Sequence, residues 1–101
     1  MFIAKIVGSV VSTQKTESMR GSKLMMIEPY VIEPKSRDHF ITTSRSLVAV
    51  DVVGAGEGQF VLAVQGSSAR MTPETKPLPV DCTIIGIIDT VNVEHKTIPL
   101  E

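Results

Sequence analysis

The stretch from Ser46 to Arg70 constrains the fold of this chain most strongly. It contains two runs rich in β-branched residues, 47–53 and 60–64, and neither run contains a proline. Such runs favour pleated strands. Between them, residues 54–58 hold three glycines, which adopt the positive φ angles of a tight turn without steric cost. The sequence therefore predicts a β-hairpin here, onto which the rest of the chain packs.

Two further segments have the pattern of strands that are covered on both sides. Residues 1–13 and 81–93 are largely apolar on both faces of an extended chain. In the first segment, the even-numbered residues from 2 to 10 share one face. Gly8 and Gly86 stand near the middle of the two segments, where a missing side chain lets a strand bend sharply. We therefore expect both strands to bend at these glycines, as the strands of a small barrel do.

Residues 23–32 predict another strand, and residues 40–42 predict a short one. Pro29 lies inside the longer strand. Because proline has no N–H to donate to a partner strand, it indicates an edge strand or a bulge. The polar residues 14–22 are expected to form an exposed loop. The tail, residues 94–101, is expected to pack on a neighbouring subunit or to fray.

The chain shows no segment with the periodicity of an amphipathic helix. Three prolines among residues 71–80 exclude a helix of useful length there, and residues 67–71 allow one helical turn with a serine cap. A length of 101 residues predicts a single domain, residues 1–101. The predicted fold class is all-β: a small, partly open, five-stranded antiparallel β-barrel that resembles the oligonucleotide/oligosaccharide-binding (OB) architecture, with at most one short helical turn.

Composition limits the partners of the chain. Hydrophobic residues make up 43% of the sequence and aromatic residues only 4%. The core is therefore aliphatic, and apolar area beyond one small core is available for a subunit interface. A formal net charge of -1 gives no general attraction to nucleic acid or anionic membranes. No stretch approaches the roughly 18–20 consecutive apolar residues of a membrane span. We expect a soluble protein without a membrane partner.

Residues that commonly carry catalysis are scattered in this sequence. His39 and His95 lie far apart in polar segments, without the spacing of a metal site, so both are interpreted as surface histidines. Cys82 is the only cysteine, which excludes a disulfide within the chain and favours a reducing, cytosolic location. Its apolar neighbours favour a buried, unreactive thiol. The sequence therefore predicts no catalytic site, no metal and no cofactor.

Two carboxylates and one loop of small residues suggest an interface. Asp51 and Asp89 each interrupt an apolar strand, and a buried carboxylate needs partners, which Arg70 or backbone amides at a subunit interface would supply. Residues 66–70 have the small side chains of an anion-binding loop, but the flanking motif of a phosphate loop is missing. A tight turn that forms hydrogen bonds across a subunit boundary is the favoured interpretation.

An OB-like barrel also raises the alternative of a nucleic-acid or small-ligand binding module. Such sites stack bases on aromatic side chains within a basic groove. Here Phe2, Tyr30, Phe40 and Phe60 are the only aromatic residues, and acidic residues balance the basic ones. Since fold alone does not determine function, this alternative ranks below an assembly role, and no nucleic-acid partner is predicted.

Four segments of the chain occur in the order found in one known family. They are IAKIVGSVVSTQK, GSKLMMIEP, VAVDVVGAGEGQFVLAVQGSSAR and PVDCTIIGIIDTVNVE. Over nearly its whole length the chain resembles the bacterial microcompartment vertex proteins of the ethanolamine-utilisation N type and the carboxysome L type. The combination of these segments is far more specific than any one of them. Residues 33–45 depart from the family pattern, because the segment is longer and carries a proline and several charges.

The resemblance implies a structural role rather than an enzyme. Members of the family are small β-barrels that form homopentamers, and these cap the five-fold vertices of a cytoplasmic protein shell built otherwise from hexameric proteins. A six-fold ring stays open as an alternative, because a small change of interface angle converts one closed ring into another. The matching residues, which the resemblance assigns to subunit contacts and the surroundings of the central axis, are Gly54, Ala55, Gly56, Gly58, Gly66, Ser67, Ser68, Ala69 and Arg70.

Overall fold

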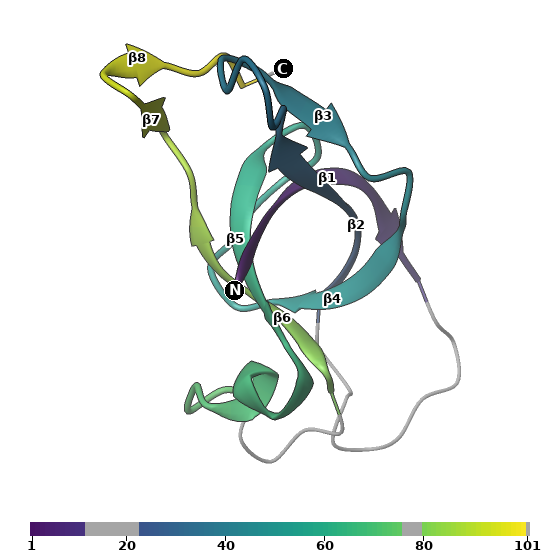
Figure 1. Ribbon diagram of the computed structural model, residues 1–101. Coiled ribbons are helices and arrows are strands. Elements are labelled where there is room, and N and C mark those ends of the chain that lie inside the picture. Colours follow the sequence, from purple (N-terminus) through teal and green to yellow (C-terminus); the bar gives the residue numbers. More distant parts are fainter. Residues whose placement is uncertain (12–22, 76–79, 101) are drawn as a thin grey trace.

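The computed structural model describes residues 1–11, 23–75 and 80–100, without the side chains of Ser68 and Arg70 (Figure 1). The predicted loop 14–22 lies outside these residues. The elements in chain order are the strands β1 (Phe2–Val10), β2 (Lys23–Ile32), β3 (Phe40–Thr42), β4 (Leu47–Asp51) and β5 (Phe60–Gln65), the 3-10 helix η2 (Gly66–Arg70), and the strands β6 (Cys82–Ile87), β7 (Asn92–Val93) and β8 (Lys96–Thr97).

Five strands close into a barrel. Neighbouring strands follow the order β1, β5, β6, β4 and β2, and pairing between β1 and β2 closes the ring, while β3 extends the sheet beside β2. Figure 1 shows these strands around a common centre. The predicted small, five-stranded, OB-like all-β barrel is therefore confirmed. It differs from the prediction in two details: the barrel is closed, and β4 and β6 pair in parallel whereas the other barrel strands pair antiparallel.

The predicted hairpin between β4 and β5 is wrong, although both strands exist. β6 lies between them: Val50 of β4 is opposite Thr83, and Ala63 of β5 is opposite Ile84. The physical reason is that β-branched runs specify pleated backbone but not the partner of each edge. The turn after β4 directs the chain away from the free edge of β4, and that edge accepts β6 instead.

The prediction that Pro29 marks an edge strand or a bulge is also corrected. β2 is an interior strand, paired with β1 on one side and with β4 and then β3 on the other. Pro29 stands where that second partner changes, because pairing with β4 ends at Ile27 and pairing with β3 begins at Tyr30. Thr43 uses its amide N–H and its hydroxyl to donate hydrogen bonds to the Pro29 carbonyl, at 3.2 and 2.8 Å. A residue without an N–H fits a position where the ladder on that side is interrupted.

Both predicted glycine bends are confirmed as irregularities in strand pairing. The register of β1 against β2 shifts between Ile6 and Gly8, and the register of β5 against β6 shifts beside Gly86. A methyl group at either glycine would meet its nearest neighbour at 3.8 Å, which is an ordinary contact. The bends therefore come from the extra residue in one strand rather than from a steric need for glycine.

The bulge in β1 corrects the predicted faces of that strand. Ile6 is opposite the buried Ile27, so it points into the barrel, but Gly8 is opposite Met26 and Val10 is opposite Leu24. Directly opposed residues of an antiparallel pair share a face, and successive residues alternate. Gly8 and Val10 therefore lie on the outer face, not on the face of Ile6, because the inserted residue reverses the alternation.

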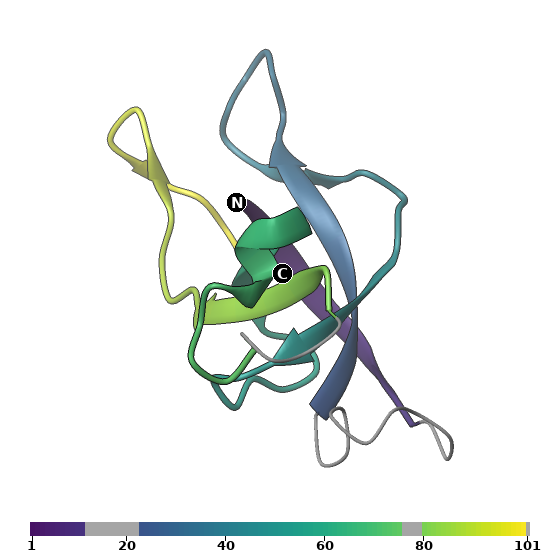
Figure 2. The same ribbon diagram turned by 90° about the horizontal axis from the view of Figure 1, so that it is seen from below.

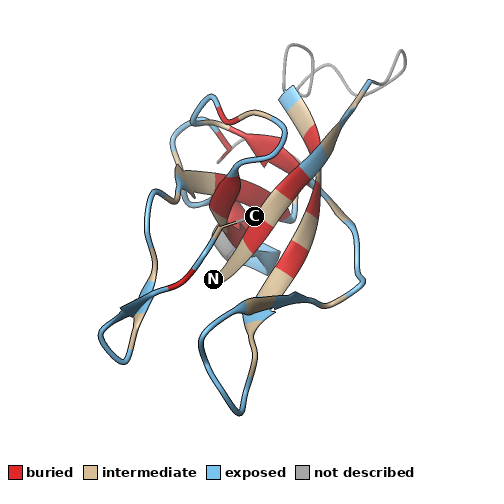
Figure 3. Cartoon of the chain, turned by 90° about the horizontal axis from the view of Figure 1, so that it is seen from above, coloured by how far each residue is buried: buried red, intermediate tan, exposed pale blue. Residues whose placement is uncertain are grey.

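Small and aliphatic side chains fill the barrel, as Figure 3 shows by the buried segments of its strands. The cluster of buried residues inside the barrel contains no aromatic residue, whereas Phe60, on the outer face, is buried with 4% of its surface exposed. Cys82 is buried as expected, with 3% of its surface exposed. The buried core cluster consists of Ala4, Ile6, Met25, Ile27, Ala49, Ala55, Val61, Ala63, Cys82 and Ile84. Three alanines at strand positions have short side chains, which allow the strands to lie close together around a narrow interior.

The single strand predicted for residues 81–93 is interrupted. β6 ends at Ile87, and the chain then leaves the barrel to form the short β7–β8 hairpin. After β8 the chain returns toward the barrel, where Ile98 is 1% exposed and its amide donates a hydrogen bond to the Val91 carbonyl. Figure 2 shows this hairpin standing away from the barrel. The helical turn predicted at residues 67–71 is confirmed as η2, one residue earlier.

Two isoleucines of β6 offer a matched test of this core. Ile84 is fully buried, whereas Ile87 is 39% exposed at the end of the same strand. We expect Ile84→Ala to lower the free energy of unfolding by about 2–5 kcal/mol, because it leaves a cavity in a close-packed interior. Ile87→Ala should cost about 1 kcal/mol or less. Urea denaturation at one fixed protomer concentration measures both, and equal losses would contradict the assignment of the core.

Candidate functional site

The Asp51 carboxylate organises the glycine turn that follows β4. One oxygen, Oδ1, accepts hydrogen bonds from the amides of Val53 and Gly54 at 2.9 and 3.1 Å, and Oδ2 accepts one from the amide of Ala55 at 2.8 Å. The side chain of Asp51 is completely buried. A carboxylate that accepts several amide hydrogen bonds holds successive residues in a compact turn.

Lys23 provides the opposite charge for this carboxylate. Its Nζ lies 3.2 Å from Oδ2 of Asp51 and donates a hydrogen bond of 2.6 Å to the carbonyl of Ala55. The Lys23 side chain is 51% exposed, so its charge stays partly hydrated. Asp51 is therefore buried as predicted, and backbone amides are among its partners as predicted, but they do not lie across a subunit interface. They come from the same chain, and the side chain of Arg70, the other predicted partner, is outside the described part.

The glycine turn combines backbone freedom with one buried anchor. Gly54 and Gly58 have φ angles of 83° and 88°, which glycine adopts far more readily than other residues. Ala55 points into the core and is 1% exposed. The Gly56 amide donates to Oε1 of Gln59 at 2.8 Å. Ala55 therefore holds the turn against its own barrel, whereas Gly54 and Gly58 are exposed. The subunit contact expected of this turn stays a prediction.

Residues 66–70 form η2, which packs on the outer face of β5 and β6. The Gly66 amide donates to the Asp81 carbonyl at 2.7 Å, and the Ala69 carbonyl accepts a hydrogen bond of 2.7 Å from the hydroxyl of Thr83. Ala69 itself is fully buried, so its side chain serves packing within the chain. Ser67 is exposed. The interface roles of Ser67, Ser68 and Arg70 stay predictions.

The two predicted interface segments do not form one site within a single chain. The glycine turn precedes β5 and η2 follows it, so they lie at opposite ends of this six-residue strand. A strand of that length spans about 20 Å. Asp89 is separate again: it lies beyond the end of β6 and is exposed. Only contact with a neighbouring subunit would bury it, and that role also stays a prediction.

Both histidines lie on the surface, as predicted. His39 is exposed, with Nδ1 2.8 Å from Oδ1 of Asp38, and His95 is exposed at the tip of the β7–β8 hairpin. The neighbouring imidazole lowers the pKa of the Asp38 carboxyl, because the hydrogen bond favours its charged form. Among the described residues, no three His, Cys, Asp or Glu side chains are placed to hold a metal ion. The described part also contains no helix of the length and apolarity needed to cross a membrane.

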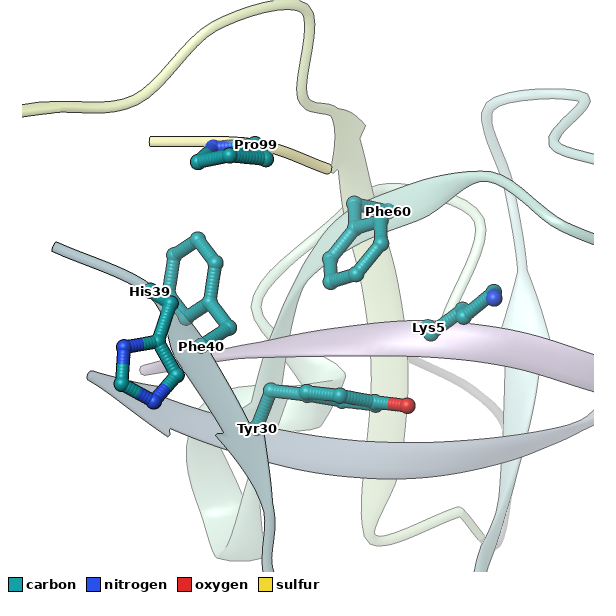
Figure 4. A pocket seen from close by; sticks show the side chains of 6 residues that line it. All are labelled: Lys5, Tyr30, His39, Phe40, Phe60 and Pro99. Atoms are coloured by element: carbon teal, nitrogen blue, oxygen red, sulfur yellow. The ribbon is translucent and has the colours of Figure 1, made fainter. Parts of the chain in front are cut away.

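Sequence reasoning missed an aromatic cluster on the outside of the barrel. Tyr30 and Phe60 have ring centroids 5.3 Å apart in an edge-on arrangement, and Phe40 lies 5.9 Å from Phe60. The Lys5 ammonium stands 5.9 Å from the centre of the Phe60 ring, as a cation–π contact. Figure 4 shows these side chains, with His39, around a hollow of about 380 Å³.

Three different strands supply the rings of this cluster, and no spacing within the sequence joins them. The pairing of Lys5 with both Glu28 and Phe60 brings the strands together. Burial, together with a hydrogen bond to the Glu28 carboxylate, raises the pKa of the Tyr30 hydroxyl. The Phe60 ring is only 4% exposed, so the half-buried rings of Tyr30 and Phe40 supply the accessible part of this cluster.

Removal of the Asp51 carboxylate should destabilise the chain strongly. Asp51→Ala leaves three amide donors without their acceptor, and we expect a loss of about 2–4 kcal/mol in the free energy of unfolding. Lys23→Met should cost less, because the amine is half exposed. Asp89→Ala is the matched control and should change the value by less than about 0.5 kcal/mol. Chemical denaturation compares the three variants, and a loss for Asp89→Ala as large as that for Asp51→Ala would refute this account.

Cys82 gives a pH dependence with a defined sign. Burial, with the negative charge of Asp81 as a smaller cause, raises its pKa to about 11 from 9.0. Between pH 9 and 11 the unfolded chain loses the thiol proton while the folded chain retains it, so stability from this group falls as pH rises. Relative to Cys82→Ala, the wild-type protein should lose stability from pH 8.5 to 10.5. Denaturation curves at pH 8.5 and pH 10.5 measure the free energy of unfolding of both proteins. A difference between wild type and Cys82→Ala that is the same at the two pH values would contradict the prediction.

Comparison with known proteins gives a consistent result. Residues 1–89 match the family described as "Ethanolamine utilisation protein EutN/carboxysome". The chain is 37% identical over 91 residues to the bacterial microcompartment shell vertex protein GrpN of Rhodospirillum rubrum, covering 90% of this chain and 96% of that protein. It is 42% identical over 93 residues to the carboxysome shell vertex protein CcmL of Synechocystis sp., covering 92% of this chain and 87% of that protein.

Solved structures agree with the sequence matches. CcmL of Nostoc sp. superimposes with a TM-score of 0.86 at 39% identity over the full length of both chains. The structure of GrpN from Rhodospirillum rubrum, described as a pentameric microcompartment shell protein, gives a TM-score of 0.75 at 36% identity and covers 92% of this chain and 98% of that one. Because the family match and the relatives both extend along most of the sequence, the chain belongs to the EutN/CcmL family.

Proposed function

We propose that this chain is a structural protein that forms a ring of five copies and caps the vertices of a bacterial microcompartment shell. One observation carries the proposal: a relative of known structure, 36% identical along 92% of the chain, is a pentameric microcompartment shell protein. A second, 30% identical, is also described as a pentameric shell protein. The relatives named above are shell vertex proteins, and none of them is named as an enzyme.

Geometry explains why such a shell needs a five-fold unit. Six-fold tiles alone cover a flat sheet, so a closed polyhedral shell needs five-fold units at its corners. A small barrel that contacts the next copy through a heterologous interface forms a closed ring when its rotation completes a circle. The partners of the chain are then other copies of itself and the hexameric shell proteins around the vertex. Its location is the shell of a microcompartment in the cytoplasm.

The alternative of a binding module has one feature in its favour. The aromatic cluster of Tyr30, Phe40 and Phe60 lies on the outside of an OB-like barrel, where such modules bind their ligands. The formal net charge of the chain is -1, however, and that gives no general attraction to a phosphate backbone. Assembly between copies is therefore the better use of the exposed apolar surface.

Native mass spectrometry of the purified protein tests the assembly. We expect a mass of five subunits that persists as the protein is diluted. A six-subunit mass would replace the five-fold ring by a six-fold tile, and a monomer at every concentration would overturn the proposal. Fluorescence anisotropy with a labelled single-stranded oligonucleotide should show no binding, and salt-dependent binding would instead favour the alternative module.

A further inference from the structure

The hollow beside the aromatic cluster is a recess between the barrel and two segments outside it. Its volume is about 380 Å³. Small-molecule sites in proteins typically have about 300–1,000 Å³, so this recess has room for a small ligand and not for a folded partner. We call it the aromatic hollow. Its lining residues are Lys5, Tyr30, His39, Phe40, Phe60 and Pro99.

Flat rings form most of the wall of the aromatic hollow. Tyr30 and Phe60 meet edge to face, and the Phe40 ring is tilted by 31° against that of Phe60. Pro99 adds a fourth ring, which lies opposite Tyr30 in the view of Figure 4. Tyr30 and Phe40 are half-buried, so part of each ring is accessible. Ring faces on two sides of a recess favour a planar aromatic group between them.

Lys5 provides a positive charge on one side of the aromatic hollow. Its side chain is half-buried. Within the described residues, no carboxylate forms an ion pair with its ammonium. Glu28 is opposite Lys5 across the strand pair, but its carboxylate accepts a hydrogen bond from the Tyr30 hydroxyl. An ammonium that is partly withdrawn from water favours an anionic group beside it.

The charges around the aromatic hollow are asymmetric. Figure 4 shows Lys5 and His39 on opposite sides of the rings. Nδ1 of His39 lies 2.8 Å from Oδ1 of Asp38, and the negative charge of that carboxylate disfavours an anion on the His39 side. A ligand would therefore direct its anionic group toward Lys5 and its apolar part toward Phe40.

The tail residue that closes the aromatic hollow is fixed by its neighbour in the chain. Ile98 is 1% exposed, and its amide donates a hydrogen bond of 2.8 Å to the Val91 carbonyl. Pro99 follows directly, so its ring is held over the hollow. A wall that is present before a ligand arrives lowers the conformational entropy that binding costs.

Three of the lining residues come from segments that the family match does not cover or that depart from its pattern. The match extends over residues 1–89, and Pro99 lies beyond it. His39 and Phe40 belong to residues 33–45, the segment that departs from the family pattern. The barrel strands supply the other lining residues. A site built partly from such segments is a property of this chain and does not follow from membership of the family.

We infer that the aromatic hollow binds a small aromatic carboxylate. The ring of the ligand lies between Pro99 and the aromatic cluster, and its carboxylate lies beside the Lys5 ammonium. The ring faces select a planar group, Lys5 selects the negative charge, and the volume limits the size. All residues of the site come from one chain, so the inference does not depend on the proposed ring of copies. A ligand in a recess and a subunit contact on an open face can coexist in one protein.

Three probes test the two parts of this recognition on the wild-type protein. Benzoate has a flat ring and a carboxylate, cyclohexanecarboxylate has the charge without the flat ring, and benzyl alcohol has the ring without the charge. Isothermal titration calorimetry should show saturable binding of benzoate with a Kd of about 1 mM or tighter. The other two should bind at least about tenfold more weakly. No saturable binding of benzoate up to about 10 mM, or equal binding of all three, would overturn the inference.

Substitutions locate the site. Lys5→Met keeps an unbranched side chain and removes the charge, so it should weaken benzoate binding at least about tenfold. Phe40→Leu removes a half-buried ring and should weaken it at least about threefold. Lys5→Arg retains the charge and should bind better than Lys5→Met. Lys96→Met, at an exposed lysine of β8 that does not line the hollow, is the matched control and should bind as the wild type does.

Circular dichroism of each variant separates loss of the site from loss of the fold. Unchanged benzoate binding in folded Lys5→Met and Phe40→Leu would overturn the inference. If one of these variants does not fold, the other variant and the three probes on the wild-type protein still decide the matter. If native mass spectrometry shows only monomers while benzoate binds as expected, the inference stands and the proposed ring is overturned.

Discussion

The contact of the Asp51 carboxylate with three successive amides is the interaction on which the topology depends. β4 must end so that its free edge stays open for β6, and the chain must then cross to the far side of β6 before it begins β5. A turn held by Val53, Gly54 and Ala55 on one carboxylate makes this change of direction over a few residues. Ala55 then places the turn against the core, so the barrel and the turn stabilise each other.

Barrel closure also decides where apolar surface is left over. Five strands around a narrow interior hold aliphatic side chains there, with small residues such as Ala4 and Ala49 beside large ones such as Ile27. The aromatic rings of Tyr30 and Phe60 lie on the outer face of the barrel, where other parts of the chain cover Phe60 and leave Tyr30 half-buried. Once every barrel strand has a partner on both edges, outer faces rather than strand edges are available for assembly. A closed barrel of this kind associates through side chains.

Sequence reasoning reached the fold class because period-two alternation, glycine bends and the lack of a helical period all point to strands. It could not assign partners to strand edges, and it therefore joined β4 to β5. The reversal of faces after Ile6 depends on one inserted residue, which is visible only through the register with β2. Asp51 stands out in the sequence as a charge within an apolar run, but its acceptor role depends on the conformation of the turn that follows.

For the other candidate site residues, too, the sequence predicts part of the outcome and leaves part open. Resemblance identified the glycine turn and residues 66–70, yet Ala55 and Ala69 are buried within their own chain. A shared motif preserves residues that fold a segment together with residues that contact a neighbour, and sequence alone does not separate the two. The aromatic cluster was missed for the opposite reason, because its members come from three strands and form no motif.

The segment that departs from the family pattern, residues 33–45, contacts the β7–β8 hairpin and lies outside the closed barrel. Oε2 of Glu33 accepts hydrogen bonds from the amides of Lys35 and Ser36 and from the Ser36 hydroxyl, at 3.1, 2.6 and 2.7 Å. These bonds lower the pKa of the Glu33 carboxyl and give the loop a defined turn. Arg37 then forms an ion pair with Glu94 of the hairpin, and Phe40 lines a hollow of about 460 Å³ together with Val93. A change of sequence here alters the support of the hairpin and leaves the barrel pairing intact.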